Sequence, residues 1–349
     1  MKNVFSSKKI TAMAALLLSV VLVLSACGSN SKSSIVEGKT NVVTSFYPLY
    51  YFASEIGGEY VNVVNLIPAG VEPHDWTPKS QDLSTASKAQ LFLYNGAGLE
   101  GWTDSFLKGL PNDQTIITAE MSKGVELIQG NPEEEHDHSG ETAEEHAEHE
   151  EHAEHDEHSD EAEGAAADEH DHEHALDVDP HTWVSPKSAI IMAENVKNSL
   201  IQVDSAHKTE YEANYEALHS KLAALDAKFE QELSKTSMKD IVVSHQAFGY
   251  LARDYGLTQT AIMGLSADAE PRAQDLLNIA KFVKENGIRY IFFEELVSPA
   301  LADTLASEAK VDTLMLNPVE GLTPEQEKNG DTYITLMEAN LQNLLKALQ

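Results

Sequence analysis

The sequence predicts an α/β fold with two similar lobes, each a mainly parallel four-stranded sheet flanked by helices. Short apolar runs recur along the chain, and each is nearly continuous, as in strands buried on both faces of a parallel sheet. Helix-like segments separate these runs, and alternation of strand and helix is typical of α/β layers. The expected strands form two groups of four, at 41–46, 61–67, 90–94 and 114–118, then 240–244, 257–263, 290–293 and 311–316.

Several of the expected helices begin at a proline, which is favourable in the first turn because its missing N–H would have no partner there. The expected helices cover 48–56, 246–255, 271–285 and 299–309. The chain ends in an amphipathic helix from about Thr323 to Leu348. In the stretch 186–236, no glycine or proline follows Pro186 up to residue 234, and apolar residues recur at helical spacing. We expect this stretch to form a long linking helix, with a candidate break at 203–205. The N-terminal lobe is then 38–185 and the C-terminal lobe is 237–349, with a ligand cleft between them.

The N-terminus has the pattern of a lipoprotein signal. Three lysines precede an apolar stretch at 10–24, and Leu-Ser-Ala precedes Cys27, which is the single cysteine. We therefore expect a signal peptide at 1–26, acylation of Cys27, and a flexible tether at 27–37. The alternative is a retained membrane anchor, because the apolar stretch is near the lower length limit for a spanning helix. A single cysteine also excludes an intrachain disulfide and a cysteine-based metal site.

The formal charge of −33 is unevenly distributed. Residues 131–175 contain 20 acidic residues and no lysine or arginine, so the rest of the chain carries −13. No basic patch is available to meet phosphate, which makes nucleic acid a poor partner. A cation is the ligand that this charge favours.

Four potential metal ligands lie at positions where α/β proteins bind ligands. His74, His245 and Glu320 each follow a predicted strand, and His181 lies directly before the linking helix. Ligands of open α/β sheets bind outside the carboxyl ends of the strands. A single histidine at such a position is more often an ordinary hydrogen-bonded residue, so the joint placement of the four carries the prediction of one metal site between the lobes.

The types of these side chains favour zinc. Three imidazoles and one carboxylate suit tetrahedral Zn²⁺, whereas Ca²⁺ and Mg²⁺ prefer shells made of oxygen. Mn²⁺ would favour more carboxylate and water. Glu294 and Glu295 end a strand and are candidate partners for the ligand histidines. Trp76 and Trp183 flank two of these histidines and are candidates to shield the site from water.

The motifs around these residues resemble those of the zinc-specific substrate-binding proteins of bacterial ABC transporters, in a cluster that also includes manganese-binding lipoproteins. They are Pro-His-Asp-Trp around His74, Asp-Pro-His-x-Trp at 179–183, and Ser-His-x-Ala-Phe-Gly-Tyr at 244–250. The similarity covers essentially the whole mature chain. It implies two α/β lobes with the metal between them.

The resemblance implies ligands at His74, His181 and His245, whereas the fourth ligand varies across the family. It can be a late acidic residue, which matches Glu320, a glutamate beside the first histidine, or water. Glu72 is the nearby candidate, but Pro73 separates it from His74, so we favour Glu320.

Residues 133–174 hold ten of the fifteen histidines, mixed with acidic residues. Such a composition cannot form a core, so we expect a disordered loop at about 132–175. Zinc members of the family commonly carry such a loop at this point. We expect low-affinity metal contacts at its histidines, which are His136, His138, His146, His149, His152, His155, His158, His170, His172 and His174.

The resemblance implies the high-affinity zinc-binding component of an ABC importer, which captures Zn²⁺ and delivers it to a membrane permease. We expect a monomer that is not an enzyme, anchored by lipid to the extracytoplasmic face of the cell membrane. One alternative is an extracellular metal buffer or adhesin that uses the histidine-rich loop. Another is a zinc hydrolase, although no His-Glu-x-x-His motif, nucleophile elbow or phosphate loop occurs.

Overall fold

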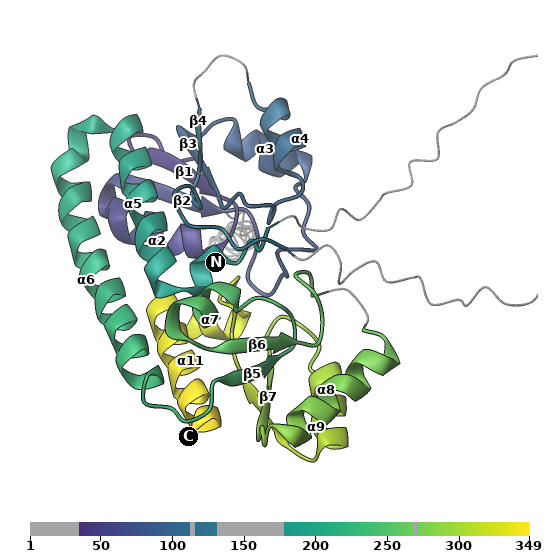
Figure 1. The fold of residues 1–349 in the computed structure, drawn as a ribbon. Helices are drawn as coiled ribbons and strands as arrows, with labels where there is room; N and C mark the ends of the chain where they lie inside the picture. The colour runs from purple at the N-terminus through teal and green to yellow at the C-terminus, as the bar shows by residue number, and fades with distance from the viewer. Residues whose placement is uncertain (1–34, 112–115, 131–177, 268–270) are drawn as a thin grey trace, which may run out of the picture.

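The computed structural model describes residues 35–111, 116–130, 178–267 and 271–349. These residues form two lobes, with a layer of long helices running along both of them (Figure 1). The predicted signal peptide, Cys27 and the histidine-rich loop lie outside the described residues. Within the described ranges, no helix has the length and the apolar character that crossing a membrane would require.

Each lobe contains a four-stranded sheet in which all the paired strands are parallel. The order in the N-terminal lobe is β2-β1-β3-β4, formed by β1 (Thr40–Thr44), β2 (Val61–Asn65), β3 (Leu91–Tyr94) and β4 (Ile117–Glu120). The order in the C-terminal lobe is β6-β5-β7-β8, formed by β5 (Asp240–Val243), β6 (Thr258–Ala261), β7 (Tyr290–Phe293) and β8 (Asp312–Met315). The strand order is therefore the same in both lobes, and the predicted fold class is confirmed.

The side chains of successive residues in the central strands pack into different hydrophobic cores, because strand side chains alternate between the two faces of a sheet. In β1, Val42 packs into a core that is shared by the two lobes, whereas Val43 packs into an outer core of the N-terminal lobe. In β5, Val243 belongs to the shared core and Val242 to an outer core of the C-terminal lobe. The outer cores include residues of α3 (Ser80–Ala86) and α4 (Thr103–Gly109) in the first lobe, and of α8 (Ala273–Glu285) and α9 (Ala300–Ala309) in the second.

The shared core joins the two lobes into one hydrophobic unit. It contains buried residues from both sheets and from five further helices. These are α2 (Tyr47–Gly57), α5 (Pro186–Val203), α6 (Lys208–Leu233), α7 (Gly249–Tyr255) and α11 (Tyr333–Leu348). Trp183 is fully buried in this core, and its ring meets Phe46 of the N-terminal lobe edge to face at 4.6 Å.

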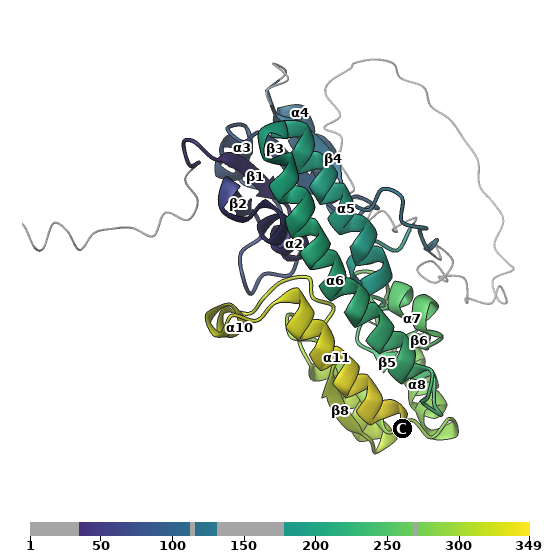
Figure 2. The ribbon, with the colours of Figure 1, turned by 90° about the vertical axis from the view of Figure 1, so that its left-hand side faces the viewer.

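The stretch predicted as one linking helix at 186–236 forms two helices, α5 and α6, which pack side by side (Figure 2). The chain leaves the helical conformation at Asp204, which has φ −142° and ψ 74°. The Asp204 carboxylate accepts hydrogen bonds from Thr40 and Tyr211, and His207 Nδ1 lies 2.7 Å from it. These contacts fix the reversal at the candidate break, so α6 alone, about 39 Å long at 1.5 Å per residue, runs back toward the C-terminal lobe.

Two other boundaries differ from those predicted. The fourth strand runs from Ile117 to Glu120 and not over 114–118, because its residues alternate in exposure and a glutamate is tolerated on the open face. The predicted C-terminal helix is interrupted at Gly330, which has a φ of 76° and ends α10 (Pro324–Asn329). The Thr332 hydroxyl then accepts the N–H of Thr335 and caps the start of α11.

Candidate metal centre

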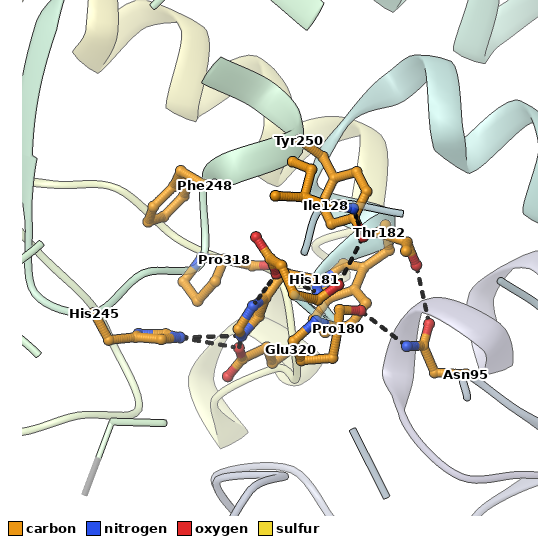
Figure 3. A network of polar contacts seen from close by, with 12 residues as sticks. Asn95, Ile128, Pro180, His181, Thr182, His245, Phe248, Tyr250, Pro318 and Glu320 are labelled. Atoms are coloured by element: carbon orange, nitrogen blue, oxygen red, sulfur yellow. Dashed lines mark hydrogen bonds and ion pairs between the residues drawn. The ribbon is translucent and has the colours of Figure 1, made fainter. Parts of the chain in front are cut away.

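The structure brings the four predicted ligand residues together at the boundary between the lobes. His74 lies in the loop after β2, His245 directly follows β5, and Glu320 lies after β8. His181 reaches the same point from the segment that precedes α5 (Figure 3). One potential ligand atom from each of the four lies within 4.8 Å of the other three.

The spacing of these atoms fits a tetrahedral ion. His181 Nε2 lies 3.1 Å from His74 Nε2 and 3.2 Å from His245 Nε2. Glu320 Oε1 lies 3.4, 3.6 and 3.8 Å from the Nε2 atoms of His181, His245 and His74. Bonds of about 2.0–2.1 Å from Zn²⁺ place the corners of a tetrahedron about 3.3–3.4 Å apart. The four side chains therefore need little movement to surround such an ion.

Burial makes this donor set costly without a cation. The side chains of His181 and His245 are fully buried, that of Glu320 is 1% exposed and that of His74 is 7% exposed. Neither carboxylate oxygen of Glu320 makes a hydrogen bond with a described residue. A buried carboxylate requires a compensating partner. A divalent ion at the centre of the four donors would supply it, in place of the imidazoles that face Glu320 in the metal-free site.

Two carboxylates orient the buried imidazoles. Asp179 Oδ1 lies 2.8 Å from His181 Nδ1 and also accepts the backbone N–H of His181. Glu294 Oε2 lies 2.6 Å from His245 Nδ1, and its Oε1 accepts the backbone N–H of His245. An Nδ1–H directed at a carboxylate leaves the Nε2 lone pair free to bind a metal and makes the ring a stronger ligand.

These partners agree only in part with the sequence interpretation. Glu294 takes the predicted supporting position, whereas Glu295 accepts hydrogen bonds from Asn317 and Gln326. In the sequence, Asp179 stands out only as part of the Asp-Pro-His-x-Trp motif, and its place two residues before His181 is the signal for its role.

The same contacts set the charge of the site without metal. Burial opposes a positive charge on His181, but Asp179 and Glu320 outweigh it and raise the pKa of His181. Burial opposes the charge on His245 as well, and Glu294 with Glu320 raises the pKa of His245 well above its usual value. Burial alone would raise the pKa of Glu320, but the facing imidazoles hold it well below the usual range. An incoming metal ion must therefore displace protons.

Glu320 is carried by a loop with an unusual backbone. Val319 is fully buried and has a φ of 59°, which is strained for a β-branched residue and costs of order 1–3 kcal/mol. Asn317 Oδ1 accepts the N–H of Val319 at 2.6 Å, and the Trp183 indole donates to the carbonyl of Pro318 at 2.8 Å. These bonds hold the loop in the conformation that directs Glu320 into the cluster.

The remaining candidates lie near the cluster or outside the described residues. Glu72 Oε1 accepts the backbone N–H of His74 at 3.2 Å, and burial together with the charge of Glu320 raises the pKa of Glu72 to about 9. Glu72 is not among the four grouped ligands. Trp183 packs beside His181, with ring centres 5.4 Å apart, whereas Trp76 packs against Trp102. Cys27 and the ten loop histidines are not among the described residues.

Comparison with known proteins agrees with this geometry. Residues 42–347 match the family described as zinc-uptake complex component A, periplasmic (ZnuA). The chain is 40% identical over 337 residues to the zinc-binding lipoprotein AdcA of Streptococcus pneumoniae, an alignment that covers 97% of this chain and 60% of AdcA. It is 36% identical over 330 residues to the high-affinity zinc uptake system protein ZnuA of Bacillus subtilis, with 94% of each chain covered. The chain therefore spans about three fifths of the length of AdcA but nearly all of the Bacillus protein.

Solved structures give the same result. The crystal structure of the Zn(II)-bound ZnuA-like domain of Streptococcus pneumoniae AdcA matches with a TM-score of 0.69 and 36% identity, over 89% of this chain and 99% of that domain. The resemblance drawn from the sequence motifs is confirmed by these matches, which extend over both lobes. The chain belongs to the zinc-uptake complex component A family.

Proposed function

We propose that this protein captures Zn²⁺ outside the cytoplasmic membrane and delivers it to the permease of an ABC importer. The observation that carries the proposal is the buried cluster of His74, His181, His245 and Glu320, in which the carboxylate has no hydrogen-bonding partner among the described residues. The names of the relatives from Streptococcus pneumoniae and Bacillus subtilis, which denote zinc binding and zinc uptake, support the choice of ion.

The ion is cargo in this proposal and does not serve as a catalytic cofactor. A catalytic zinc keeps one position open for water or substrate, whereas four protein ligands fill a tetrahedral shell. Three of the four side chains are also at most 1% exposed, so substrate would have no access to the ion. This geometry disfavours the hydrolase alternative and suits a carrier that must retain its ion.

The cellular setting extends this proposal. Acylation of Cys27 would anchor a monomer to the extracytoplasmic face of the membrane, beside the permease that receives the ion. The histidine-rich loop at about 132–175 would supply weak additional contacts for divalent ions, close in sequence to His181.

Calorimetric titration of Zn²⁺ tests the proposal, using protein that lacks the residues before Cys27. The informative variants are His245→Ala and a deletion of 132–175, with His219→Ala as the matched control. His219 lies on α6, away from the cluster, and packs beside Tyr215. We expect one tight site that survives the deletion and the control substitution but is lost in His245→Ala. Weak multiple binding that disappears with the loop and ignores His245 would instead favour the metal buffer or adhesin.

A further inference from the structure

We propose that Asn95 is a positioning residue, which holds His181 in its metal-binding orientation and is itself fixed by the buried Glu100. The inference rests on the proposed function, in which His181 binds the transported ion. Asn95 directly follows β3, at the same edge of the sheet as His74, and its side chain is fully buried. It lies outside the group of four ligands, so its contribution would act through His181.

The side chain of Asn95 forms hydrogen bonds with the residues on both sides of His181 (Figure 3). Its Nδ2 donates to the carbonyl of Pro180 at 2.9 Å, and its Oδ1 accepts the hydroxyl of Thr182 at 3.2 Å. His181 has φ −77° and ψ 44° and lies outside the regular helices and strands, so no ladder of backbone bonds fixes its position. The two bonds from Asn95 supply that restraint from the N-terminal lobe.

Glu100 connects Asn95 to the neighbouring strand of the sheet. Its Oε1 accepts the Ser45 hydroxyl at 2.6 Å and the N–H of Asn95 at 2.7 Å, while its Oε2 accepts the N–H of Gly96 at 3.1 Å. Ser45 directly follows β1, so one buried carboxylate ties the ends of two neighbouring strands together. These three hydrogen bonds of Glu100 do not involve the ligand cluster, and their effect is to fix the backbone that carries the Asn95 side chain.

The C-terminal lobe holds the same segment from the other side. The Tyr250 hydroxyl donates to the carbonyl of Asp179 at 2.7 Å, and the Asp179 carboxylate in turn faces His181 Nδ1. The segment around His181 is therefore held by hydrogen bonds from both lobes, from Asn95 on one side and from Tyr250 on the other. An asparagine suits the contacts with Pro180 and Thr182 because its amide offers both donors and an acceptor at the end of a short side chain. An aspartate would keep the acceptor for Thr182 but could not donate to Pro180.

The experiment measures Zn²⁺ affinity by competition with a chelator, and the absorption spectrum of the Co²⁺-loaded protein, in Asn95→Asp and Asn95→Ala. Loss of such an outer partner should lower affinity by about 10–100-fold. A tetrahedral Co²⁺ site absorbs more strongly than a site with more ligands. If His181 is displaced and water molecules enter in its place, the coordination number rises and the Co²⁺ bands should weaken. The matched control is Asn195→Ala. Asn95 donates to the carbonyls of Pro180 and Gly96, and Asn195 similarly donates to two backbone carbonyls, those of Met121 and Lys123.

Thr182→Val gives a second route that leaves Asn95 in place. It removes one of the two bonds, so we expect a smaller loss of affinity, and the losses of Thr182→Val and Asn95→Ala should not add in the double variant. Wild-type affinity and spectrum in both Asn95 variants would overturn the inference, as would an equal loss in Asn195→Ala. If the wild-type protein showed no tight site, the proposed function would fail as well. Tight wild-type binding with unaffected Asn95 variants would overturn the positioning role alone.

Discussion

Zinc binding should release protons from the site, and the affinity should therefore fall in acid. In the metal-free protein the pKa values of His181 and His245 lie above the ordinary 6.5, because Asp179, Glu294 and Glu320 favour the charged imidazoles. Both rings must be neutral at Nε2 to bind a metal ion. Below the raised pKa values each ring holds a proton that the incoming ion displaces.

The magnitude follows from the number of protons displaced. Each proton released makes the apparent affinity change tenfold per pH unit, so two protons give up to about 100-fold per unit, or about 2.7 kcal/mol. The sign is fixed by the direction of the pKa shifts. Affinity rises with pH until the raised pKa values of the two imidazoles are passed, and it falls as pH drops through and below them.

The assay is calorimetric titration of Zn²⁺ at one pH in two buffers that differ in their enthalpy of ionisation. The difference in heat divided by the difference in buffer enthalpy gives the number of protons released. His219→Ala should leave that number unchanged, because His219 lies on α6 away from the cluster. Equal heats in both buffers, together with an affinity that stays flat between about pH 8 and 6, would refute the assignment of raised pKa values to the ligand imidazoles.

Three substitutions test the surroundings of the site. Asp179→Asn removes the anion beside His181 Nδ1 and should weaken zinc binding about 10–100-fold in a chelator competition, without loss of fold measured by circular dichroism. Tyr333→Phe removes the hydroxyl that donates to the Trp183 carbonyl at 2.6 Å. It should lower the free energy of unfolding, measured in urea, by about 1–3 kcal/mol. A loss smaller than the error of the urea curve would contradict this. Gly249→Ala places a Cβ 2.4 Å from Asp179 Oδ2 and should reduce both thermal stability and zinc affinity, whereas Gly101→Ala, which meets nothing within 4 Å, should leave both unchanged.

The strands and the positions of the candidate ligands were the most predictable features of this chain. Parallel strands that are buried on both faces need continuous apolar runs, and such runs overlap all eight strands, although the half-exposed β4 begins three residues later than predicted. The carboxyl ends of the strands indicated where His74, His245 and Glu320 would lie. Boundaries were harder wherever one polar residue decides the conformation. Asp204 reverses the chain through contacts with Thr40 and Tyr211, and no local pattern shows a partner so far away in sequence.

The supporting contacts of the site were the least predictable, because they depend on geometry between distant segments. Asn95 meets Pro180 and Thr182 across 85 and 87 residues of sequence. The conformation of Val319 is also invisible in sequence, since valine normally avoids a positive φ and its value of 59° is imposed by surrounding bonds. Sequence patterns therefore identified the candidate metal ligands, whereas the hydrogen bonds that orient these side chains could be found only in the structure.

The core shared by the two lobes has a consequence for how this protein melts. Trp183 packs against Phe46 and receives a bond from Tyr333, so side chains of both lobes contribute to one continuous interior. Heating should therefore produce a single calorimetric transition, with no intermediate in which one lobe has unfolded alone. Neither lobe expressed by itself would contain a complete core. Bound zinc should then raise the melting temperature of the entire molecule, including helices far from the ion.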